Sequence, residues 1–220
     1  MDFVPLIISA KLAVVSTILL LVLAMPLAAA LVFGRFPGRF LADSLVSLPL
    51  VLPPTVLGFY LLMLMGPNGA VGKAWSSWAG GSLVFTFTGI TLAAMIHSLP
   101  FAVQPLKTSF QKIDKRLLEM ASVLGASPAA IFFRVIVPNS LGGIAASAIL
   151  AFAHTMGEFG VILMIGGSIP GRTKVASIAI YEYVETMHYR EAAYMSLILV
   201  IISYLVLVGV NMLNSRERHA

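Results

Sequence analysis

The chain has 220 residues, of which 59% are hydrophobic and 10% are charged, and its mean hydropathy is +0.98. This composition excludes an ordinary soluble domain and indicates a membrane protein. The formal net charge is +5, but the basic residues stand in short segments between apolar runs, which excludes a continuous nucleic-acid-binding surface.

Five apolar runs are long enough to cross the roughly 30 Å hydrocarbon core of a bilayer as helices. They cover residues 10–33, 43–65, 83–104, 139–165 and 193–213. The sequence therefore predicts an all-α polytopic membrane protein with about five transmembrane helices, organised as a single domain over residues 1–220. The first run has no basic segment before it and exceeds the core of a signal peptide, so we expect it to remain as a membrane anchor.

The basic residues predict the direction of the chain in the membrane. If residues 105–138 face the cytoplasm, nine basic residues lie inside and five outside, as the positive-inside rule favours. The inside set is Arg35, Arg39, Lys107, Lys112, Lys115, Arg116, Arg134, Arg216 and Arg218, and the outside set is Lys11, Lys73, Arg172, Lys174 and Arg190. We therefore expect the N-terminus outside and the C-terminus in the cytoplasm.

Prolines interrupt the second and third predicted spans at Pro49, Pro53, Pro54 and Pro100. Each proline removes a helical donor, so these spans are predicted to be kinked or locally broken. The kinks either shape a pathway or only fit the packing, because neighbouring helices can satisfy the freed carbonyl groups.

The charged segment between the third and fourth spans is predicted to form a compact knob, the name used below for residues 113–134. An amphipathic helix is expected over Ile113–Leu124, with its apolar face formed by Ile113, Leu117, Met120 and Leu124. Gly125 is a natural helix end, and Ser127 with Pro128 is a typical cap and first position of a second helix. Such a knob could dock into a soluble partner or lie on the membrane surface.

The knob carries a family resemblance. Glu119-Met120-Ala121, then three residues, Gly125, nine residues and Val135-Ile-Val-Pro138 resemble the EAA loop of ABC importer permeases. The family pattern has Glu-Ala-Ala and Ile-x-Leu-Pro, so the spacing agrees while Met120, Val135 and Val137 depart conservatively. The resemblance implies a type I ABC importer permease with a cytoplasmic coupling loop at about residues 105–138. The residues it assigns to coupling with an ATPase are Glu119, Met120, Ala121, Gly125, Ala126, Ser127 and Pro138.

Other motifs narrow this resemblance. The proline-rich segment Leu48–Leu62, Ser98–Pro105, Gly157-Glu-Phe-Gly160 and Ile169-Pro-Gly-Arg-Thr173 with Ala179-Ile-Tyr181 are similar to molybdate importer permeases. Sulfate and thiosulfate permeases share the Gly-Glu-Phe/Tyr-Gly motif, which alone indicates only oxyanion uptake. The proline-rich span and the Ile-Pro-Gly-Arg-Thr motif favour molybdate or tungstate over sulfate.

The resemblance also implies partners. It implies two copies of a cytoplasmic ATP-binding subunit, an external molybdate-binding protein and a second copy of this chain, all at a cell inner membrane.

The chain itself is expected not to be an enzyme, because Gly66–Ala74 only imitates a phosphate loop: its spacing is wrong and Ala74 lacks the hydroxyl that binds magnesium.

A polar seam is predicted in the fourth span. Ser140, Ser147, His154 and Glu158 recur at spacings of seven, seven and four residues, which places them along one helical face. His154 lies one turn before Glu158 and is expected to donate to its carboxylate. Because a carboxylate repels a molybdate dianion, the seam of Ser147, His154 and Glu158 is assigned to gating or structure. The neighbouring Gly142, Gly143, Ala145 and Ala146 permit close helix approach and are consistent with a homodimer.

No metal site and no cofactor are predicted. The chain has no cysteine, and His188 has no second histidine at zinc-protease spacing. Ser98 follows His97 without a Gly-x-Ser-x-Gly elbow, so His97 is expected to pack beside Pro100, and an intramembrane hydrolase is the weaker alternative. An ATP-independent channel or carrier is the third possibility, although an odd number of spans without self-similarity disfavours an inverted-repeat carrier.

Overall fold

The computed structural model describes residues 2–217, without the side chains of Leu207 and of residues 210–217. Within these residues every regular element is a helix, which confirms the predicted all-α class. Three helices are long and apolar enough to cross a membrane alone: α1 (Val4–Phe33), α5 (Phe87–Gln111) and the apolar part of α11 (Tyr189–Glu217). Two bent helix pairs raise this number to five if each pair is one span. Arg218, placed inside above, lies outside the described residues, as does the side chain of Arg216.

The second predicted span is broken at its prolines. It consists of α2 (Arg39–Ser47), the short 3-10 helix η1 (Leu48–Leu50) and α3 (Pro54–Met65), with a bend of 111° between Arg39–Leu50 and Pro54–Met65. Pro54 takes the first position of α3, where its missing N–H leaves no helical hydrogen bond unmade. The predicted interruption of this span is thus confirmed. The third span is not broken, because α5 continues as one helix through Pro100 and Pro105.

The fourth predicted span is too long at its C-terminal end. The helix α7 (Pro128–Ile131) continues into the π-helical turn η2 (Phe132–Ile136), bends by 45° at Pro138, and leads through η3 (Pro138–Ser140) into α8 (Leu141–Met156). The expected continuation to residue 165 is wrong, because α8 ends at Met156 and α9 (Gly160–Gly166) is a separate helix. Glu158 stabilises this break by accepting a hydrogen bond from the N–H of Val161 in the first turn of α9, at 2.9 Å.

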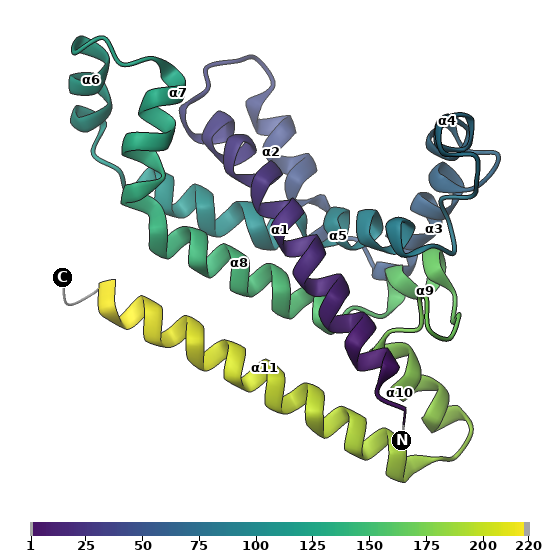
Figure 1. Cartoon of the computed structure of the whole chain (residues 1–220). Helices are drawn as coiled ribbons and strands as arrows, with labels where there is room; N and C mark the ends of the chain where they lie inside the picture. Colours follow the sequence, from purple (N-terminus) through teal and green to yellow (C-terminus); the bar gives the residue numbers. More distant parts are fainter. Residues whose placement is uncertain (1, 218–220) are drawn as a thin grey trace.

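The centre of the molecule is formed by α1, α5 and α8, which contact one another (Figure 1). Small residues bring α5 and α8 together: a Cβ atom on Gly143 would lie 2.2 Å from the Cβ of Ser109. The hydroxyl of Ser147 donates to the carbonyl of Ala102 at 2.6 Å. The predicted close approach at the small residues of α8 is therefore present within one chain.

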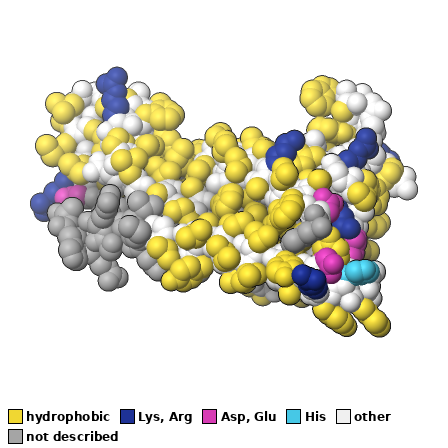
Figure 2. Space-filling model, turned by 60° about the horizontal axis from the view of Figure 1, so that its bottom comes forward, with side chains coloured by type: hydrophobic (Ala, Val, Ile, Leu, Met, Phe, Trp, Pro, Cys, Tyr) yellow, Lys and Arg dark blue, Asp and Glu magenta, His cyan; other side chains and the backbone are white. Residues whose placement is uncertain are grey.

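The two ends of the molecule differ in content. One end carries the knob, with α6 (Lys115–Val123) and α7, and the other carries α4 (Ala70–Ala79), α10 (Ala176–Glu185) and the N-terminal end of α1 (Figure 1). In the view of Figure 2, hydrophobic side chains cover the middle of the molecule, and most charged side chains gather toward its two ends. This distribution is typical of a protein whose middle is embedded in lipid.

Candidate functional site

The first part of the knob is a short helix with an apolar exposed face. Asp114 caps α6 by accepting from the N–H of Arg116 at 2.9 Å. The predicted start of this helix at Ile113 is wrong, because Ile113 lies before the cap, is 8% exposed and packs in the core beneath the knob. The exposed apolar side chains on α6 and its C-terminal end are Leu117, Met120, Val123 and Leu124.

A glycine corner follows α6 and confirms the predicted shape of the knob. Gly125 has a φ of +80°, in the left-handed region that favours glycine. The N–H of Gly125 donates to the carbonyl of Ser122 and the N–H of Ala126 to that of Ala121, each at 3.0 Å. These two hydrogen bonds form the Schellman motif, which fixes the exit direction of the chain.

The second part of the knob begins as predicted. The hydroxyl of Ser127 accepts from the N–H of Ala130 at 3.2 Å, and Pro128 holds the first position of α7. Glu119, Gly125 and Ser127 are exposed, while Ala121 and Ala126 are half-buried at the corner. The knob is therefore a mostly exposed projection with hydrogen-bonded turns and an apolar surface.

The knob is connected to the two central helices. It follows α5 directly, and it leads through η2 and Pro138 into α8, which packs against α5. Ile113 at its start and Ile136, two residues after its end, belong to the same buried cluster as Phe110 of α5. The knob is thus joined to α5 by packed side chains and leads directly into α8.

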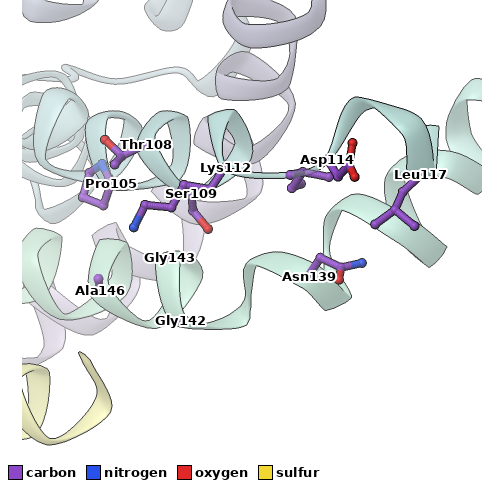
Figure 3. A pocket seen from close by; sticks show the side chains of 11 residues that line it. Pro105, Thr108, Ser109, Lys112, Asp114, Leu117, Asn139, Gly142, Gly143 and Ala146 are labelled. Carbon is purple, nitrogen blue, oxygen red and sulfur yellow. The ribbon is translucent and has the colours of Figure 1, made fainter. Parts of the chain in front are cut away.

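A cavity of about 760 Å³ lies at the foot of the knob, between the end of α5 and the start of α8 (Figure 3). The side chains of Ser109 and Lys112 point toward α8, whereas the carboxylate of Asp114 points away from it (Figure 3). The wall on α8 consists of Gly142, Gly143 and Ala146. The sequence did not predict this cavity, because its lining comes from α5, the start of the knob and α8. The only signal was the group of polar residues after the predicted third span.

A buried polar cluster lies toward the opposite end of the same two helices. The Nδ1 atom of His97 on α5 is 2.9 Å from Oε2 of Glu158, and both side chains are 7% exposed. On the next residue of α5, the hydroxyl of Ser98 is 2.9 Å from Nδ1 of His154 and 2.9 Å from Oγ1 of Thr155. The cluster joins α5 to the C-terminal end of α8 and to the α8–α9 break.

The predicted hydrogen bond from His154 to Glu158 is wrong, although the two side chains lie near each other. Because α8 ends at Met156, Glu158 no longer lies one helical turn after His154. Its carboxylate bonds to the ring of His97 instead. His154 bonds to Ser98 and stacks on Phe101 with 3.9 Å between ring centroids. The sequence missed the partner of Glu158 because that partner is 61 residues away on another span.

The comparisons with known proteins decide the family. Residues 21–218 match the model of the binding-protein-dependent transport system inner membrane component. The chain belongs to this family of transport permeases. It is 48% identical to the molybdenum transport system permease protein ModB of Azotobacter vinelandii, over 90% of this chain and 87% of that protein.

More distant relatives are also transport permeases. The ModB protein of Escherichia coli strain K12 is 38% identical over 71% of this chain and 68% of its own length. The sulfate transport system permease protein CysT of the same strain is 32% identical over 83% of this chain and 65% of its own length. Among solved structures, a bacterial ABC transporter that imports alginate has a TM-score of 0.76 at 18% identity, covering 97% of this chain and 79% of its own, and so shares the fold.

The polar cluster of this permease offers three groups that could ligate a metal. Ligand atoms of His97, His154 and Glu158 lie within 4.8 Å of one another. Both carboxylate oxygens and both Nδ1 atoms already have hydrogen-bond partners in the protein. These hydrogen bonds connect α5 to α8 and to the α8–α9 break, and a histidine bonded through Nδ1 still offers Nε2 to a metal.

The cluster also bears on the hydrolase alternative. Ser98 is fully buried, and within the described residues no carboxylate is hydrogen-bonded to His154, because Glu158 is bonded to His97 and to the N–H of Val161. A nucleophilic serine needs access to substrate and an oriented base. The geometry is that of a packing contact between helices.

Proposed function

We propose that this chain is the transmembrane permease subunit of an ABC importer that carries molybdate, or the near-isosteric tungstate, into the cytoplasm. The observation that carries the proposal is the 48% identity to a molybdenum permease over 90% of the chain, against 32% to a sulfate permease. The exposed, glycine-cornered knob supports the coupling role.

The energy comes from a separate subunit in this proposal. Two cytoplasmic ATPase subunits bind two copies of this chain, each through the coupling loop at about residues 105–138 of its single domain. The exposed apolar side chains of Leu117, Met120 and Val123 supply the contact area, and Glu119 at their edge supplies specificity. Because the knob projects rigidly from the membrane domain, nucleotide-driven closure of the ATPases would move it as a body.

The transported anion arrives from the other side. An external binding protein delivers molybdate to the end of the permease that carries α4 and α10, and the knob and C-terminus face the cytoplasm. A relative of the same fold offers an analogy: the bacterial alginate transporter is known in complex with a ligand-bound periplasmic protein. ATP and the loaded binding protein can drive the transition only if they bind one conformation more tightly than the other.

The polar cluster acts as a structural clamp in this mechanism. The contact of His97 with Glu158, and that of Ser98 with His154, hold α5, α8 and α9 together, so that movement at the knob reaches the outer end. Ser147 adds a further tie between α5 and α8 through the carbonyl of Ala102.

Uptake into vesicles containing the complete complex tests the proposal. ATP-dependent accumulation of radiolabelled molybdate, competed by tungstate more strongly than by sulfate, is the expected result. Competition by sulfate alone would assign the chain to sulfate import, and flux without ATP would indicate a channel. Hydrolysis of a peptide or ester by the isolated chain would favour an enzyme instead.

A further inference from the structure

The end of the molecule opposite the knob carries a cavity of about 340 Å³ with two basic residues in its wall. Lys11 enters it from α1, and Arg172 enters it from the loop between α9 and α10. The segment Phe85–Phe87, which leads into α5, forms the third side. Three segments far apart in the sequence therefore meet at this cavity.

Arg172 stands on a firmly built turn. The hydroxyl of Thr173 is fully buried, donates to the carbonyl of Gly166 at 2.6 Å, and accepts from the N–H of Ile169 at 3.2 Å. Gly171 has a φ of +73°, which the turn requires. These bonds fix the backbone beneath the guanidinium, so little backbone entropy is lost when the side chain binds an anion.

The opposite wall is also held in place. Phe85 has a φ of +61°, a strained conformation for a residue other than glycine, and its N–H donates to the carbonyl of Ile165 at 2.8 Å. Such strain persists only where surrounding contacts enforce it, and it concentrates at functional sites. The ammonium of Lys11 lies 4.8 Å from the ring centroid of Phe87, a cation–π contact that keeps it at the cavity.

The two cations have no acidic partner in the described part of the chain. Neither Lys11 nor Arg172 forms an ion pair there, whereas the neighbouring Lys174 is paired with Glu182. Lys11 and Arg172 are exposed, and two uncompensated positive charges at one cavity attract a dianion. The guanidinium can bind two oxygens of a tetrahedral anion while the ammonium binds a third.

We propose that Lys11 and Arg172 form an anion site at the outer mouth of the permease, which takes the tetrahedral oxyanion as it leaves the external binding protein. This inference rests on the proposed function. The site is connected to the polar cluster, because α9 begins at the helix turn bonded by Glu158 and ends next to the turn that carries Arg172. An anion at the mouth thereby contacts the unit that the knob moves.

Maximal uptake by the complete complex tests this site. At saturating loaded binding protein, Lys11→Gln and Arg172→Gln should each lower the maximal rate of molybdate uptake at least about tenfold, the effect of losing one charge-assisted contact. Lys73→Gln and Arg190→Gln remove the same charge at the same predicted side, away from the cavity, and should retain the wild-type rate. Basal ATP hydrolysis should be equal in all four variants.

A charge-rescue experiment separates the anion site from a folding defect. The chain has no cysteine, so Arg172→Cys carries a single reactive thiol. A cationic thiol reagent should restore uptake, and a neutral reagent of similar size should not. Rescue by both reagents, or by neither, would overturn the proposal.

Two further results would also contradict the site. An unchanged maximal rate in both Gln variants would remove these residues from substrate handling. A change confined to the KM for the binding protein would assign them to protein docking instead. If the wild-type complex imports sulfate and not molybdate, the proposed substrate is wrong, and the same variants then test the anion site with sulfate.

Discussion

The buried carboxylate of Glu158 should contribute more to the stability of the permease than an exposed carboxylate does. In Glu158→Ala, the N–H of Val161 and the ring of His97 both lose their acceptor, at positions that are 0% and 6% exposed. An unsatisfied buried donor costs about 1–3 kcal/mol, so two donors give an expected loss of about 2–6 kcal/mol in the free energy of unfolding.

Two further variants provide comparisons for the stability loss expected of Glu158→Ala. In Glu158→Gln, the amide oxygen can still accept from Val161 and the amide nitrogen can donate to the other tautomer of His97, so the loss should be smaller. Glu185→Ala removes an exposed carboxylate and should leave stability nearly unchanged. Thermal unfolding of the purified complex, with ATP-driven uptake measured in parallel, gives the comparison. Equal stability of Glu158→Ala and Glu185→Ala would refute the clamp.

Three other predictions concern the glycine corner of the knob, the contact between α5 and α8 at Gly143, and the ion pair of Glu182 on α10. Gly125→Ala forces a Cβ into a left-handed backbone, which costs about 1–2 kcal/mol, and should weaken co-purification of the ATPase. Gly80→Ala makes the same change at a φ of +71°, but at the end of the molecule opposite the knob, and should not weaken it. Gly143→Ala should reduce uptake because the new Cβ meets Ser109 at 2.2 Å, and adding Ser109→Gly should recover it. The pKa of Glu182 is lowered: burial raises it, but hydrogen bonds from its lysine and serine partners outweigh that effect. Because its pKa is lowered, the ionised Glu182 stabilises the fold at pH values above its ordinary pKa of 4.5, and this contribution is lost as the pH falls below that value. Glu182→Gln should therefore flatten the acid side of a curve of stability against pH. An unchanged curve would contradict the pairing with Lys174.

Local signals in the sequence were sufficient for the knob. Gly125, Ser127 and Pro128 act through the backbone of their own turn, so their positions along the chain predict the corner and the second helix. The break before Pro54 was predictable for the same reason. The first helix of the knob was expected over Ile113–Leu124 and is observed over Lys115–Val123. Ile113 is drawn into the core by contacts that its own segment does not reveal.

The polar cluster depends on contacts between spans and could not be predicted by helical spacing. The seam assumed that one helix continues past Met156, but the carboxylate of Glu158 instead caps the next helix and bonds to His97. The cavity with Lys11 and Arg172 was missed for a similar reason, since its two cations are far apart in the sequence. Motif resemblance identified the segments, and the fold was needed to show which of them meet.

Single-cysteine labelling tests the central claim, that the knob is the cytoplasmic contact with the ATPase. Val123 and Trp78 are 88% and 83% exposed at opposite ends of this cysteine-free chain, which makes them a matched pair. In the complete complex, Val123→Cys should crosslink to the ATPase subunit and resist a membrane-impermeant thiol reagent added from outside, while Trp78→Cys should react with that reagent. Labelling of Val123→Cys from outside, with no crosslink to the ATPase, would contradict the coupling role and the transport function proposed with it.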